Sequence, residues 1–113
     1  MSIRPEQYWI IATTENEEQR SNPASRRNTV AAEHQAFIKS LDDRGILLVH
    51  GAARDELGVR VGPGFIVFAA PTRQEAEQIA RTEPYIANGF RTLRLLPWQA
   101  KLGRAAAQEA RRA

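Results

Sequence analysis

Two short runs of continuous apolar residues, Ile46–Val49 and Phe65–Phe68, constrain the fold of this chain more than any other feature. They read Ile-Leu-Leu-Val and Phe-Ile-Val-Phe, with no alternation of apolar and polar residues. A strand with one face in water does alternate, because successive side chains point to opposite faces of the sheet. These runs therefore predict two strands whose side chains are apolar on both faces, so both faces should be covered.

Two further segments are typical of strands and bring the expected number to four. Tyr8–Thr13 is rich in aromatic and β-branched residues, and Arg91–Leu96 lies just before a proline. The polar, glycine-rich segment Arg54–Gly64 predicts a hairpin loop between the two apolar runs. After the first strand, the polar stretch Thr14–Asn28 predicts a long loop, and loops of that length often act as lids.

Apolar residues spaced three and four apart predict two helices. The first begins at about Thr29 and ends before Gly45, with an inward stripe of Val30, His34, Phe37, Ile38 and Leu41. The second begins at Thr72 and ends near Pro84, because proline disfavours helical geometry in the residue before it. The resulting order, β-α-β-β-α-β, indicates a ferredoxin-like α+β fold, a four-stranded antiparallel sheet with two helices on one face.

The other face of this sheet has no helix to cover it. At roughly 25 cal/mol per Å², leaving several hundred Å² of apolar surface in water would forfeit on the order of 10 kcal/mol. Patches of that size usually mark interfaces, and two-fold symmetry is the commonest arrangement of identical chains. We therefore expect a homodimer joined sheet to sheet.

Length and composition set further bounds. A chain of 113 residues fits one domain, expected over residues 1–98, followed by a helical tail over residues 99–113. No secretory signal or run of roughly 20 apolar residues is present, so a cytoplasmic protein without membrane association is expected. There is no cysteine and no metal or phosphate motif, and we expect no metal and no cofactor. The net charge of +3 is spread over separated arginines, which favours a solvated surface over nucleic-acid binding.

Two side chains are the candidates for catalysis. His34 interrupts an apolar helical stripe and should point inward, where a histidine can act as a general acid or base. The alternative is a core histidine that bonds a backbone carbonyl. Glu83 continues the stripe of the second helix, so its carboxylate could also turn toward the sheet, unless Pro84 directs it into water.

Three further residues are candidates for substrate binding. His50 ends the second strand and could line the same cavity. Arg26 and Arg27, in the expected long loop before the His34 helix, could fold over that cavity and hold an anionic small molecule. The alternative for both arginines is a solvated loop.

The segment Gly62–Phe68 is similar to an RNA-recognition signature, and that module shares the same element order. Pro63 stands where an aromatic residue should stack on a base, and Val61 stands where a basic residue is expected. Single-stranded RNA binding is therefore the least favoured interpretation.

Several short motifs carry a resemblance to a known family. In order along the chain they are His34–Ile38, Gly45–Gly51, Glu75-Ala76, Glu83–Gly89 and Leu96–Trp98. With this order and spacing the chain resembles the YciI-like (YCII-related) family of dimeric α+β barrel proteins. The resemblance implies a ferredoxin-like fold, a sheet-to-sheet dimer and a cavity served by a histidine–aspartate pair.

Carried onto this sequence, the resemblance assigns the histidine to His34 and the acidic residue of an Asp-Pro-Tyr-like motif to Glu83. Relatives often carry an arginine where this chain has Ala31. A few relatives perform eliminations or isomerisations on ring-derived metabolites. The functional expectation is a lyase or isomerase in which His34 and Glu83 transfer a proton, and the alternative is a non-catalytic ligand-binding or accessory dimer.

Overall fold

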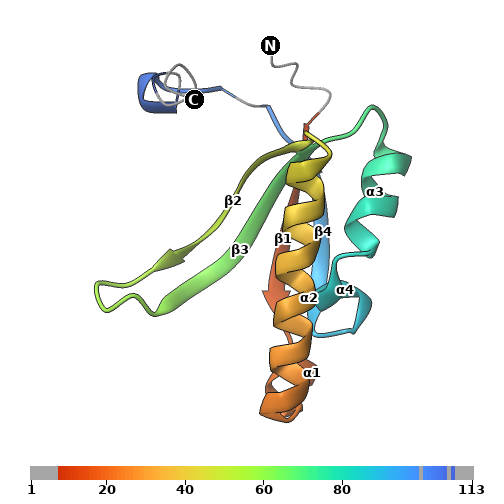
Figure 1. Cartoon of the computed structure of the whole chain (residues 1–113), viewed down its shortest axis with the longest axis vertical. Coiled ribbons are helices and arrows are strands. Elements are labelled where there is room, and N and C mark those ends of the chain that lie inside the picture. The colour runs from red at the N-terminus through yellow and green to blue at the C-terminus, as the bar shows by residue number, and fades with distance from the viewer. Residues whose placement is uncertain (1–7, 100, 107, 109–113) are drawn as a thin grey trace.

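The computed structural model describes residues 8–99, 101–106 and 108. Its strands are β1 (Tyr8–Glu15), β2 (Leu47–Arg54), β3 (Arg60–Ala69) and β4 (Arg91–Pro97). Its helices are α1 (Glu17–Ser21), α2 (Ala24–Asp43), α3 (Arg73–Arg81) and α4 (Pro84–Ala87). All pairings in the sheet are antiparallel, in the order β2-β3-β1-β4. The predicted α+β fold is confirmed, with α1 and α4 as two short additions (Figure 1).

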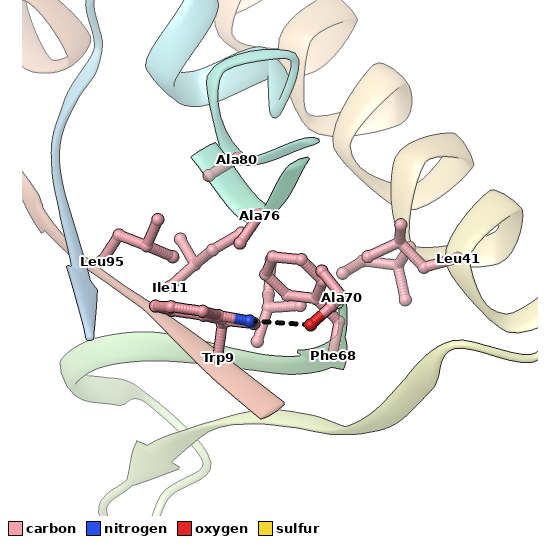
Figure 2. Close-up of a cluster of buried hydrophobic side chains, with 10 residues drawn as sticks. Trp9, Ile11, Leu41, Phe68, Ala70, Ala76, Ala80 and Leu95 are labelled. Carbon is pink, nitrogen blue, oxygen red and sulfur yellow. Dashed lines mark hydrogen bonds between the residues drawn. The ribbon is translucent and has the colours of Figure 1, made fainter. Parts of the chain in front are cut away.

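One face of the sheet packs against α2 and α3. Trp9 and Ile11 of β1 and Phe68 of β3 meet Leu41 of α2 and Ala76 of α3 in one buried cluster (Figure 2). The indole Nε1–H of Trp9 donates a hydrogen bond of 3.0 Å to the carbonyl oxygen of Ala70, so this polar atom is satisfied inside the cluster. This packing fixes α2 over the sheet and thereby sets the position of His34.

The expected end of the first helix is confirmed at Gly45. This residue has a φ of +73°, a left-handed conformation that glycine adopts without steric cost. Its N–H donates to the carbonyl of Asp42, and the next N–H, of Ile46, donates to the carbonyl of Leu41. The chain therefore reverses tightly and enters β2 at once.

The expected loop over Thr14–Asn28 is wrong, because most of this segment is helical. Asn16 accepts a hydrogen bond from the N–H of Gln19 and caps α1, and Pro23 directly precedes the first turn of α2. The first side chain that α2 buries is Val30. The six residues of α2 before Val30 are exposed, so no apolar periodicity marks them as helical.

The β2–β3 hairpin is longer than expected. The segment Arg54–Gly64 was predicted as a loop, but β3 begins at Arg60 and pairs it with Arg54. Asp55 closes the remaining turn, since its Oδ1 accepts from the N–H groups of Leu57 and Val59 at 2.9 Å each. The hairpin extends sideways beyond α2 (Figure 1).

The second face of the sheet, here called the open face, is apolar and has no helix over it among the described residues. Its side chains are Tyr8, Ile10, Leu48, Val49, Val67, Ala69, Leu96 and Trp98. Tyr8 and Val67 are buried among their neighbours, whereas Val49 is 52% exposed and Leu96 39% exposed. The sheet therefore carries apolar side chains on both faces, as expected.

Two remaining expectations concern the whole chain. None of the helices within the described residues is both long and apolar enough to span a membrane. Residues 104–106 are helical, but much of the expected tail over 99–113 lies outside the described residues. The division into a domain over 1–98 and a tail over 99–113 therefore stays a prediction.

Candidate functional site

A cavity of about 350 Å³ lies on the helix-covered side of the sheet, bounded by α2, β1 and the β2–β3 hairpin. Its lining combines apolar walls with a concentrated set of ionisable side chains. The ionisable ones are His34, His50, Arg54, Arg60, Glu83 and Arg91. Pockets of this size that join apolar walls to a few convergent polar groups are typical of small-molecule sites.

His34 and Glu83 form the shortest polar contact in this cavity. The Nδ1 atom of His34 lies 2.5 Å from Oε1 of Glu83. The side chain of Glu83 is 2% exposed, and that of His34 is 19% exposed. The structure therefore brings both candidate catalytic residues together, 49 positions apart in sequence. His34 bonds a carboxylate rather than a backbone carbonyl, and Glu83 faces inward rather than into water.

The spacing of Glu83 predicted that it continues the second helix, and this prediction is wrong. Helix α3 ends at Arg81, and Glu83 is the N-cap of α4, with Pro84 at the first helical position. Proline is favoured there because its fixed φ suits the helix and its missing N–H is not needed. The second carboxylate oxygen of Glu83, Oε2, accepts from the N–H of Ile86 at 3.1 Å. One oxygen of Glu83 is thus fixed by the backbone while the other meets His34.

Aromatic and cationic groups pack behind this pair. The ring of Tyr85 lies 4.9 Å from that of His34, and the guanidinium carbon of Arg91 lies 3.8 Å from the centre of the Tyr85 ring. Arg91 is buried, and its Nε donates to Oε1 of Gln19 at 3.1 Å. Tyr85 is thereby held between His34 and Arg91, which limits the rotation of the imidazole.

The other sequence-predicted site residues divide into two groups. His50 lines the cavity, at the register position opposite Ile66. Arg26 and Arg27 lie in the first turns of α2 and are not among the lining residues. Arg26 donates to the side-chain oxygen of Asn88, and the Nε of Arg27 donates to the carbonyl oxygen of Asn22 at 3.1 Å.

Sequence reasoning missed the cations that do line the cavity, namely Arg54, Arg60 and Arg91. Arg91 could have been found, because it shares the inward face of β4 with Leu93 and Leu95 at a period of two. A charged residue on the buried side of a strand is unusual unless it is paired or functional. Arg54 and Arg60 were hidden because the ends of both hairpin strands were taken for loop.

Within the described residues, no group of three or more His, Cys, Asp or Glu side chains could hold a metal ion.

Similarity to known proteins was found for the fold and for the sequence family. No curated protein matches the sequence. Among solved structures, the fold is similar to 5-chloro-2-hydroxyhydroquinone dehydrochlorinase from Burkholderia phenoliruptrix AC1100, solved in complex with 2,5-dihydroxybenzoquinone. The TM-score is 0.62 at 16% identity, and the match covers 87% of this chain and 97% of that chain. At this identity the likeness establishes the fold alone.

A family model gives the stronger assignment. The model of the YCII-related domain matches residues 7–99, a range that contains all four strands and both long helices. The expected family is therefore confirmed, and this chain belongs to the YCII-related domain family.

Proposed function

We propose that the cavity is the active site of a small-molecule lyase or isomerase in which His34 transfers a proton and Glu83 orients the His34 imidazole. The observation that carries this proposal is the 2.5 Å contact between His34 Nδ1 and Glu83 Oε1 at the cavity wall. A histidine held by a buried carboxylate is the arrangement that fixes an imidazole for acid–base work.

The roles of the two residues follow from their hydrogen-bonding capacity. An ionised carboxylate only accepts, so Nδ1 of His34 carries a proton and donates a hydrogen bond to Oε1 of Glu83. In the neutral imidazole, Nε2 then has the lone pair and lies on the side of the ring away from Glu83. His34 lines the cavity, so Nε2 is the atom that would accept a proton from a substrate there.

The reaction class rests on what such a base can do without further groups. It removes a proton from the substrate, and the electron pair left behind either forms a new double bond while a leaving group departs, or shifts a double bond before the proton is returned. The first course is an elimination and the second an isomerisation. The structural neighbour acts as a dehydrochlorinase, and this supports elimination from a hydroxylated ring as the first course to examine.

The proposal is tested by turnover. Wild-type protein and the His34→Gln variant would be incubated side by side with hydroxylated and chlorinated ring compounds, starting with 5-chloro-2-hydroxyhydroquinone. Turnover that the variant loses supports proton transfer by His34. Equal turnover by both proteins contradicts it. Saturable binding of a ring compound without turnover would identify a non-catalytic binding protein instead.

We also propose that the open face of the sheet is covered by the same face of a second copy. Val49 and Leu96 are large apolar side chains in water on this face, and burying a side chain of this kind contributes about 1.5–3 kcal/mol. In a two-fold dimer each of these residues is buried once on each subunit, so its contribution to the dimer occurs twice.

Dimerisation is expected to depend on the open face alone. Sedimentation equilibrium at micromolar concentration should give about twice the chain mass of 12.7 kDa. Leu96→Lys should shift the mass to that of one chain, because it places a charge in the apolar interface. Leu57→Lys is the matched control, since Leu57 lies in the hairpin turn and is 89% exposed. A wild-type mass near 12.7 kDa, or equal effects of both variants, would contradict this proposal.

A further inference from the structure

The cavity has a marked excess of positive charge. Among its described lining residues, three are arginines and one, Glu83, is acidic. Glu83 directs one oxygen to His34 and the other to a backbone N–H. Both oxygens of the Glu83 carboxylate therefore have hydrogen-bond partners within the chain. The three guanidinium groups together carry more positive charge than this carboxylate carries negative charge.

Two of these arginines face each other across the hairpin. Arg54 of β2 and Arg60 of β3 are direct register partners, and like charges in that position destabilise an antiparallel pair. Arg54 donates to the carbonyl oxygen of Gly58 at 2.8 Å, which ties its guanidinium to the turn. A bound anion beside these two guanidinium groups would reduce their mutual repulsion.

The guanidinium of Arg60 lies across Gly64, four residues further along the same strand. A Cβ atom at Gly64 would come within 2.5 Å of one Arg60 nitrogen. The pairing of β3 with β2 is irregular between Arg60 and Gly64, and Gly64 lies on the face of β3 that also carries Ile66 and Phe68 of the helix-covered core. The glycine thus leaves space for the Arg60 side chain to lie along the cavity wall.

Arg91 approaches the same space from the start of β4. Burial lowers the pKa of Arg91 from its ordinary value, and the positive charge of Arg60 lowers it further, against the opposite influence of Tyr85 and Glu83. The fields of Arg60 and Arg91 therefore overlap in the cavity. Stacking on Tyr85 and the bond to Gln19 fix the plane of the Arg91 guanidinium.

We propose that the cavity binds a small organic carboxylate, with Arg60 and Arg91 holding the oxyanion and the apolar walls holding its carbon frame. A guanidinium presents paired N–H donors that match a carboxylate. Ile11 and Ile66 supply apolar contact in the same lining, which favours an organic acid over an inorganic ion. As a statement of substrate class, this inference rests on the proposed function, but it is measurable as binding without turnover.

The test is a titration of the ¹⁵N-labelled full chain, followed by amide chemical shifts, with benzoate and with the neutral isostere benzamide. Benzoate should produce saturable shifts at the amides of the cavity wall, such as those of Ala52 and Phe65, while benzamide at the same concentration should not. Equal shifts from both compounds, or no saturable shift from benzoate at tens of millimolar, would overturn the inference.

Three variants assign the binding to Arg60. Arg60→Gln removes one charged donor and should weaken benzoate about tenfold, as expected for losing a charge-assisted hydrogen bond. Arg27→Gln removes the same charge from α2 outside the cavity lining and should leave the affinity unchanged. Gly64→Ala keeps the charge but displaces the Arg60 guanidinium, so it too should weaken benzoate. Equal affinities of Arg60→Gln and Arg27→Gln would overturn the assignment.

The two proposals fail separately. Turnover of a ring compound by a protein that does not prefer benzoate to benzamide would refute the carboxylate site and leave proton transfer standing. Benzoate binding through Arg60 in a protein whose turnover survives His34→Gln would refute proton transfer and leave the carboxylate site standing.

Discussion

Replacing His34 by glutamine is expected to lower kcat by about 10²–10⁴, the usual contribution of a general acid or base. Glutamine has a comparable size and can still bond Glu83, so the fold and the cavity should persist. It has no group that exchanges a proton near neutral pH, so the chemical step itself should fail. The measurement is kcat and KM on the ring compound that the wild-type protein turns over best.

His50→Gln is the matched control for this prediction. His50 lines the same cavity and has no bond to Glu83, so its replacement should change KM more than kcat. If His50→Gln lowers kcat as much as His34→Gln does, the assignment of the proton transfer to His34 is wrong.

Replacing Glu83 by alanine is expected to lower the free energy of unfolding by about 2–4 kcal/mol. Two losses add: the cap of α4, worth about 0.5–2 kcal/mol, and a buried hydrogen-bond partner of His34, worth about 1–3 kcal/mol. Glu83 is 1% exposed, so water cannot readily replace either bond. Urea denaturation followed by circular dichroism measures the change.

Two variants separate these losses from a general effect of removing a glutamate. Glu83→Gln keeps an oxygen that can accept from the Ile86 N–H and should cost clearly less than alanine. Glu77→Ala removes a half-exposed partner of Arg81 and should cost less than about 1 kcal/mol, as surface ion pairs do. A Glu83→Ala protein as stable as Glu77→Ala would show that the buried carboxylate does not support the site.

Much of the fold could be predicted because apolar residues determine it. The run Phe65–Phe68 lies in β3, the run Ile46–Val49 lies in β2 except for Ile46 directly before it, and the stripe that contains Leu41 lies in α2. The elements that could not be predicted lie in polar segments. The first six residues of α2 are exposed, and α1 buries no side chain, so neither segment leaves an apolar period in the sequence.

The candidate site could be predicted in part for a similar reason. His34 was identified because it interrupts an apolar stripe, and its partner Glu83 because it follows one, yet their contact joins residues 49 positions apart. Periodicity gives the face on which a residue lies but not the partner that meets it across the fold. Arg60 escaped notice since its role depends on where β3 begins, and strand ends are set by pairing rather than by composition.

The central claim is that Glu83 holds His34 with its proton on Nδ1 and its lone pair on Nε2. Long-range ¹H–¹⁵N correlation spectra of the imidazole distinguish the two tautomers directly, at a pH where His34 is neutral. In the wild-type protein we predict protonated Nδ1 and bare Nε2, and in Glu83→Ala we predict that this preference is lost. A wild-type His34 with its proton on Nε2 would contradict the account, because no lone pair would then face the substrate.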